Sequence, residues 1–167
     1  AILNGGNYDA VIIATGAEPA KPGIPGIDSK NVCYVPDILG CKRAAGDNCV
    51  VIGGGEAGTE TAAFLLPINK SVTILEADKE LAAVVDEQIT IALENTGAEE
   101  IQFHKKASSF FTINGVSDVI VAVGTKSVNP FKKKIPGISK VEIVGDAAAA
   151  KDGLAATAAG FRVGYYI

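Results

Sequence analysis

Three glycines near the middle of the chain constrain the fold more than any other feature. They stand in Cys49-Val-Val-Ile-Gly-Gly-Gly-Glu-Ala-Gly-Thr-Glu60, where an apolar run rich in β-branched residues meets a helix-compatible segment, 56–66. The spacing Gly53-x-Gly55-x-x-Gly58, between a strand and a helix, is typical of a turn that binds a dinucleotide. The sequence therefore predicts a βαβ unit built around this turn.

Each glycine of the turn has a separate physical task. Gly53 permits the tight exit from the strand, Gly55 lets a pyrophosphate approach the backbone, and Gly58 lets the helix press against the strand. Free N–H groups and the positive end of the helix dipole then stabilise the phosphate charge. We expect the turn to contact the dinucleotide through Gly53, Gly54, Gly55, Glu56, Ala57 and Gly58.

An acid follows the next predicted strand. Glu76 ends the run Val72-Thr-Ile-Leu-Glu76, about twenty residues after the turn. A carboxylate there accepts hydrogen bonds from the adenosine ribose and repels a 2′-phosphate, so Glu76 and its neighbour Ala77 favour NAD(H) over NADP(H). Asp78 adds to the repulsion, whereas Lys79 opposes it. The alternative is a solvated acid at a strand end.

The remaining pattern predicts an α/β fold with a parallel sheet and right-handed crossovers. Asp37 could be the N-cap of a short helix, and residues 17–30 and 126–140 are predicted linkers. Strands are predicted at 8–16, where the continuous apolar run indicates full burial, and at 49–52, 72–76, 101–107, 118–124 and 140–146. Helices are predicted at 56–66, 86–95 and 153–167.

Charge and composition exclude several functions. A net charge of −4 and a pI near 5.0 provide no basic surface for nucleic acid. No apolar run reaches the roughly 20 residues that span a membrane. Cys33, Cys41 and Cys49 lack metal-ligand and C-x-x-C spacing, which predicts buried reduced thiols, no metal and a cytoplasmic location. His104 is the only histidine, so no catalytic triad is apparent.

The sequence contains no methionine and begins Ala-Ile-Leu-Asn. We therefore expect it to be a piece of a longer protein, and we identify no catalytic residue within it.

Beyond the glycine turn, the chain resembles two-dinucleotide-binding flavoproteins of the glutathione reductase-like pyridine nucleotide-disulfide oxidoreductase superfamily. Four stretches carry the resemblance, in family order: Tyr8-Asp-Ala-Val-Ile-Ile-Ala-Thr-Gly16, the turn at 50–60, Val119-Ile-Val-Ala-Val-Gly124 and Val144-Gly-Asp146. Three further stretches resemble the C-terminal half of old-yellow-enzyme-like NADH:flavin oxidoreductases, which include 2-enoate reductase, 2,4-dienoyl-CoA reductase and trimethylamine dehydrogenase. These are Gly16-Ala-Glu-Pro19 with Ile24-Pro-Gly-Ile-Asp28, Gly58-Thr-Glu-Thr-Ala62, and Ala159-Gly-Phe-Arg-Val-Gly164.

The resemblance implies a Rossmann-like NAD(H)-binding domain at residues 41–125, inserted in an incomplete FAD-binding lobe made of residues 1–40 and 126–167. In the FAD lobe, it implies that the corner Ala14-Thr15-Gly16 lies near the flavin and that Gly145-Asp146 binds the ribityl chain. The helix beginning near Gly153 would point its N-terminus at the flavin. Gly124 would lie beside the nicotinamide nucleotide.

The departures from the family pattern define the expected partners. No FAD fingerprint precedes Tyr8, and the redox-active cysteine pair of disulfide reductases is absent. In the subgroup, the first FAD half, an FMN barrel and an iron–sulfur cluster lie upstream. The prediction is a fragment of an NADH-dependent, enoate reductase-like flavoprotein that passes hydride from NADH to FAD and is inactive alone. The alternatives are a non-catalytic NAD(H)-binding or regulatory module, and an electron-transfer subunit whose FAD lies on a partner chain.

Overall fold

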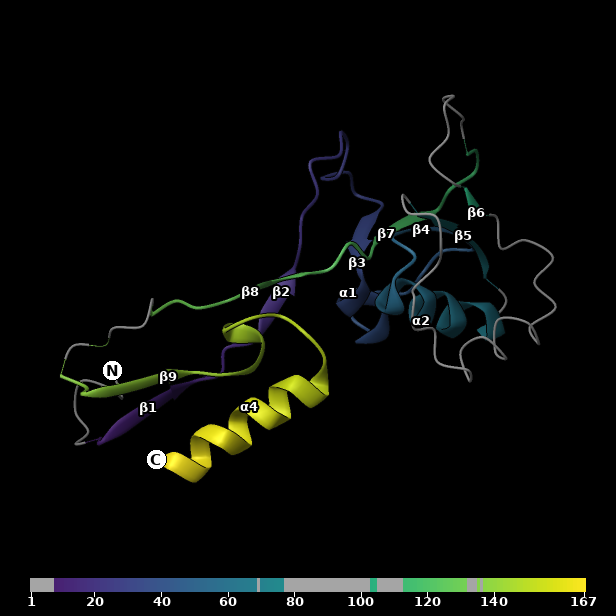
Figure 1. The fold of residues 1–167 in the computed structure, drawn as a ribbon. Coiled ribbons are helices and arrows are strands. Elements are labelled where there is room, and N and C mark those ends of the chain that lie inside the picture. The colour runs from purple at the N-terminus through teal and green to yellow at the C-terminus, as the bar shows by residue number, and fades with distance from the viewer. Residues whose placement is uncertain (1–7, 69, 77–102, 105–112, 132–134, 136) are drawn as a thin grey trace. The chain divides into compact units, whose positions relative to one another are not determined.

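Two compact units make up the computed structural model of the chain (Figure 1), which describes residues 8–68, 70–76, 103–104, 113–131, 135 and 137–167. Unit 1 comprises residues 1–18 and 125–167, and unit 2 comprises residues 19–124. Both contain parallel strands and helices, so the predicted α/β class with parallel sheets is confirmed.

A five-stranded sheet in the order β3-β7-β4-β5-β6 forms the centre of unit 2, and each neighbouring pair of its strands is parallel. The strands are β3 (Val32–Tyr34), β4 (Asn48–Ile52), β5 (Ser71–Leu75), β6 (Phe103–His104) and β7 (Asp118–Val121). The predicted strands at 49–52 and 72–76 are therefore confirmed, and the strand predicted at 118–124 is confirmed for residues 118–121. Of the predicted strand 101–107, the described part is β6, and the predicted helix 86–95 lies outside the described residues.

Strand β4 lies between β5 and β7, and this position explains its apolar sequence. Cys49 and Val51 have no exposed surface, because both sheet neighbours and helix α2 (Glu56–Leu65) surround them. Helix α1 (Val35–Leu39) adds Ile38 to the same core, to which α2 contributes Leu65. Helix α2 passes into the short 3-10 helix η1 (Leu66–Ile68), whose proline ends the helix as predicted.

The structure corrects the prediction for Asp37. The N-cap of α1 is Tyr34, and Asp37 is the third helical residue. Its carboxylate accepts a hydrogen bond of 3.0 Å from the backbone N–H of Tyr34. Asp37 therefore still stabilises the helix start, but from inside the first turn.

In unit 1, β1 (Ala10–Ile13) pairs in parallel with β9 (Lys140–Ile143). Strand β2 (Ala17–Pro19), whose last residue is the first of unit 2, pairs with β8 (Thr125–Ser127). A 3-10 helix, η2 (Gly145–Ala147), follows β9, and the C-terminal helix is α4 (Gly153–Tyr166). One face of β1 and β9 packs on Ile135, Ile138 and Ala147. Ile12 on the other face is 47% exposed, so the expectation of a fully buried first strand is wrong. Among the described residues, β9 is the one strand that pairs with β1.

The two compact units divide the chain after residues 18 and 124, whereas the sequence predicts divisions after residues 40 and 125. Residues 32–39 belong to unit 2 because β3 pairs with β7 and α1 packs on α2. Which nucleotide each unit binds stays a prediction.

The cysteines are unpaired, and two of the three are buried as predicted. Cys33 and Cys49 belong to the core of unit 2, where burial raises the pKa of the Cys33 thiol to about 11 and also raises the pKa of Cys49. Cys41 is exposed, which corrects the expectation for that residue. The buried thiols are therefore poor nucleophiles and contribute to the fold as apolar side chains.

Candidate nucleotide-binding site

The ends of three strands meet around the glycine turn at the carboxyl edge of the unit 2 sheet. The backbone N–H of Gly53 donates to the carbonyl of Leu75 at the end of β5, with a distance of 2.8 Å. On the other side, the N–H of Ala122 donates to the carbonyl of Ile52, also at 2.8 Å. The chain leaves β4 through α2 toward β5, while β7 lies on the opposite side of β4. In open α/β sheets, ligands bind beyond the carboxyl ends of the strands at such a switch in strand order.

Gly53 and Gly58 close this turn by backbone contact. Gly53 has φ of +107°, and a Cβ atom there would overlap the carbonyl group of Ala122. A Cβ atom on Gly58 would overlap the carbonyl oxygen of Gly53 and lie 3.0 Å from its carbonyl carbon. Gly58 and Gly54 are buried. The roles predicted for the first and third glycines of the motif thus have a direct geometric basis.

Gly55 differs from these glycines because the space beside it is open. It is the exposed N-cap of α2 in extended conformation, with φ of −70° and ψ of −176°. A Cβ atom there would meet no heavy atom within 4 Å. Glu56 and Ala57, the first helical residues, are exposed as well. The start of α2 therefore presents backbone N–H groups and its positive dipole end to an open approach, which fits an anionic phosphate.

The carboxylate of Glu76 contacts the turn itself. Its Oε2 accepts a hydrogen bond of 2.5 Å from the backbone N–H of Gly54. The contact arises because β5 runs parallel to β4, with Leu75 opposite Ile52, so the residues after both strands become neighbours. The sequence predicts a ribose contact for Glu76 but not this bond, because no local pattern reveals which strands are adjacent. Ala77 lies outside the described residues.

Gly124 lies at the same edge as the turn, three residues beyond the end of β7. It is exposed with φ of +94°, and a Cβ atom there would meet nothing within 4 Å. The structure therefore brings Gly124 and Glu76 to the strand ends that flank the glycine turn.

The residues predicted for a flavin lie together at one end of the β1–β9 pair. Ala14, Thr15 and Gly16 follow β1, while Gly145 and Asp146 follow β9. The N–H of Val144 donates to the carbonyl of Ile13, at 2.9 Å, so both corners leave the sheet side by side.

Two of these side chains bond to the backbone of unit 1. The Asp146 carboxylate accepts a hydrogen bond from the N–H of Lys151, at 3.2 Å, and the Thr15 hydroxyl donates to the carbonyl of Val128. Both bonds hold the loops that surround the corners. Helix α4 begins after Asp152, whose carboxylate accepts a hydrogen bond of 2.7 Å from the N–H of Ala155.

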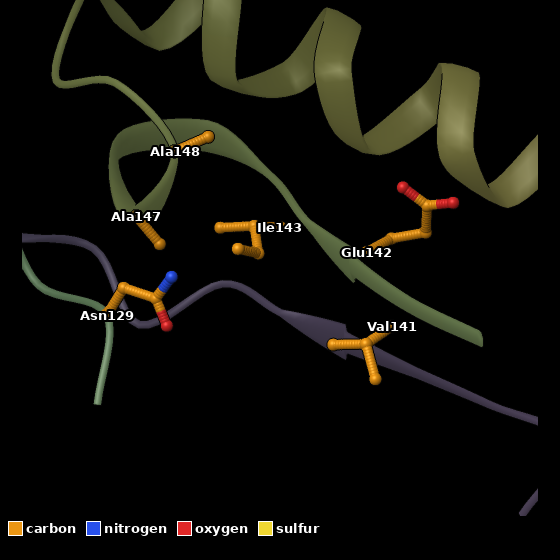
Figure 2. A pocket seen from close by; sticks show the side chains of 6 residues that line it. All are labelled: Asn129, Val141, Glu142, Ile143, Ala147 and Ala148. Carbon is orange, nitrogen blue, oxygen red and sulfur yellow. The ribbon is translucent and has the colours of Figure 1, made fainter. Parts of the chain in front are cut away.

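A pocket of about 330 Å³ opens beside these corners in unit 1 (Figure 2). Figure 2 shows the Asn129 amide lying near Ile143 and Ala147, whereas the Glu142 carboxylate points toward α4. No sequence pattern marks the lining residues as a site, because they are ordinary strand and loop residues that only the fold brings together. The lining residues are Asn129, Val141, Glu142, Ile143, Ala147 and Ala148.

In the part of the chain that the structure describes, no three His, Cys, Asp or Glu side chains form a group that could hold a metal ion. No helix among the same residues has the length and apolar character needed to cross a membrane.

Comparison with known families gives an independent view of the chain. The profile of the family described as pyridine nucleotide-disulphide oxidoreductase matches residues 4–134. The match confirms the superfamily that the four stretches predict.

Three similar proteins match this chain over only part of their own length. An NADH oxidase of Thermoanaerobacter brockii is 31% identical over an alignment 182 residues long, which covers 95% of this chain and 28% of the relative. A cinnamate reductase of Clostridium sporogenes is 37% identical over 76 residues, which cover 46% of this chain and 11% of the relative. A solved 2-naphthoyl-CoA reductase structure matches with a TM-score of 0.85 and 27% identity, over 95% of this chain and 27% of its own. The chain thus spans at most 28% of the length of these proteins, and the two reductases agree with the predicted subgroup.

Proposed function

Because the chain belongs to the pyridine nucleotide-disulphide oxidoreductase family, we propose that its glycine turn binds NADH within a larger flavoprotein reductase. In that protein NADH would pass hydride to FAD, and the electrons would move on to further centres. The observation that carries the proposal is the open space at Gly55, directly in front of the N-terminus of α2.

The geometry of the turn favours an anionic dinucleotide. The N–H groups of Gly55 to Ala57 would bind the pyrophosphate, since the helix start is exposed and a Cβ atom at Gly55 would meet no heavy atom within 4 Å. The Glu76 carboxylate, held at the carboxyl edge by Gly54, would accept hydrogen bonds from the adenosine ribose. A carboxylate at this position repels a 2′-phosphate, which favours NADH over NADPH.

Unit 1 would supply one side of the flavin site. The corners Ala14–Gly16 and Gly145–Asp146 lie together after two parallel strands. The backbone N–H of Lys151, which donates to Asp146, and the Thr15 hydroxyl, which donates to the carbonyl of Val128, hold their loops. Nicotinamide and flavin supply the hydride chemistry when they are bound. The residues of this chain bind and orient the two nucleotides.

The remainder of the reductase would be the partner of this chain. The similar proteins are several times longer than the stretch they share with it. We expect the chain alone to bind NADH weakly and to catalyse little, because one half of the flavin site would come from the rest of the polypeptide. The unpaired thiols agree with a cytoplasmic location.

Gly55→Asp tests the proposed NADH site. Aspartate is a favourable N-cap in extended conformation, so the free energy of unfolding should stay equal or increase. Its carboxylate would occupy the phosphate position, so we expect the Kd for NADH to rise at least about 30-fold, from steric and charge repulsion. NADH fluorescence titration measures this without interference, because the chain contains no tryptophan.

Gly55→Asn is the matched control for charge, since it has nearly the same shape as aspartate and is also a good N-cap. We expect its affinity for NADH to lie between those of the wild type and Gly55→Asp. If Gly55→Asp binds NADH as tightly as the wild type, the glycine turn is not the NADH site.

Reconstitution with FAD tests the flavin assignment. Joining the chain to the upstream half of its parent should produce the visible absorbance of a bound flavin, and Asp146→Ala should reduce flavin occupancy. A flavin site that is unaffected by Asp146→Ala would contradict the assignment of Gly145–Asp146.

A further inference from the structure

The described cations of unit 2, apart from Lys21, lie at one end of its sheet, where two of them are paired with acids. The lysine and arginine residues that unit 2 contains in the described ranges, apart from Lys21, lie in segments that lead into a strand: Lys30, Lys42, Arg43 and Lys70. The guanidinium of Arg43 donates to Asp118, the first residue of β7, and the Lys70 ammonium donates to Asp47 at 2.9 Å. These cations lie at the amino edge of the sheet, away from the glycine turn.

In the part of unit 2 that the structure describes, two acids lie at the carboxyl edge. Glu56 is the first residue of α2, and Glu76 follows β5 and accepts from Gly54. Lys21 follows Ala20, whose backbone N–H donates to the carbonyl of Gly124 at this edge. The Lys21 ammonium is paired with the Asp28 carboxylate at 2.5 Å.

The position of Glu56 makes it a competitor of the ligand. A carboxylate in the first turn of a helix is attracted by the positive dipole end, which is equivalent to about half an elementary charge. A pyrophosphate at the start of α2 would interact with the same dipole end. Glu56 carries a full negative charge next to Gly55, and both residues are exposed. The carboxylate therefore stabilises the unliganded helix and repels an anionic ligand at its start.

We propose that Glu56 is a specificity-determining residue that acts by repulsion, so that the affinity for NADH increases with ionic strength. The proposal rests on the binding of NADH at the glycine turn. A site lined with basic side chains would show the opposite salt dependence, because salt would screen an attraction. Here salt screens the repulsion between Glu56 and the pyrophosphate, and ligands with more phosphate charge are disfavoured further.

Glu56→Gln tests this inference, because glutamine keeps the size of the side chain and removes its charge. At about 0.01 M salt, where the Debye length is about 30 Å, we expect the Kd of the variant for NADH to be three- to tenfold lower than that of the wild type. At about 1 M salt, where the Debye length is about 3 Å, the two values should agree within about twofold. The Kd of the wild type for NADH should itself be lower at about 1 M salt than at about 0.01 M salt.

Asp47→Asn is the matched control, because it changes the net charge equally but lies at the amino edge, where Asp47 is highly exposed. Its Kd for NADH should stay within about twofold of the wild type at either salt concentration. An equal effect of Asp47→Asn and Glu56→Gln would overturn the inference, since net charge alone would then explain the change. A Glu56→Gln variant that binds NADH no more tightly than the wild type at low salt would also overturn it. The proposed function fails separately, if the wild type does not bind NADH or if Gly55→Asp leaves its affinity unchanged.

Discussion

Gly58→Ala is expected to destabilise unit 2 by about 3 kcal/mol, at the upper end of the usual cost of overpacking. The added Cβ would overlap the carbonyl oxygen of Gly53 and lie 3.4 Å from the Cβ of Ala122. Both neighbours are held in place, because Gly53 is bonded to β5 and Ala122 is bonded to β4. Relief of the overlap therefore requires α2 to move away from the sheet. Urea denaturation of the variant and the wild type measures the difference.

Gly55→Ala is the matched control for this prediction. The chemical change is the same and occurs three residues earlier, but the new Cβ atom meets nothing within 4 Å. We expect a change of about 1 kcal/mol or less, chiefly from a poorer N-cap. Equal destabilisation by the two variants would show that contact between the helix and the strand exit is not the reason for glycine at 58.

Asp118→Ala is expected to cost about 3 kcal/mol of stability. Asp118 is 4% exposed, and its carboxylate accepts from the Arg43 guanidinium and, at 2.6 Å, from the N–H of Gly46. Removal of the carboxylate leaves a charge and a backbone donor without their partner. We place the cost at the lower end of the range for a broken buried ion pair, because the Arg43 side chain is 34% exposed and gains water. Thermal unfolding followed by circular dichroism measures the loss.

A double variant separates the ion pair from the packing around it. Arg43→Met with Asp118→Leu removes both charges and keeps side chains of similar size, so we expect it to be more stable than Asp118→Ala. If Asp118→Ala costs less than about 1 kcal/mol, the pair does not hold the amino edge of the sheet together.

Much of the fold was predictable because local signals agreed with one another. The apolar run before Gly53, the helix-compatible residues after Gly55 and the proline at 67 specify a strand, a turn and a helix within one short stretch. The structure has these elements as β4, α2 and η1. Where local signals were weaker, the prediction was wrong in detail, as with Asp37, whose side chain stabilises the helix from its third position.

Burial could not be predicted with the same success, because it depends on neighbours that are distant in sequence. The apolar run of β1 indicates a strand buried on both faces, but Ile12 is 47% exposed. In the similar run of β4, Cys49, Val50 and Val51 are buried, since strands lie on both sides of β4 and a helix packs on it. Sequence periodicity does not distinguish the two cases.

The sequence by itself determined the glycine turn, its position between a strand and a helix, and the acid after the next strand. These features are local, and their physical tasks follow from backbone geometry and charge. Only the tertiary structure decided that Glu76 bonds to Gly54, that Arg43 reaches Asp118, and that the described cations of unit 2 lie mainly at the edge away from the turn. The reason is that strand order and direction bring together residues that are distant in the chain. No local sequence pattern reveals which of these distant residues will be in contact.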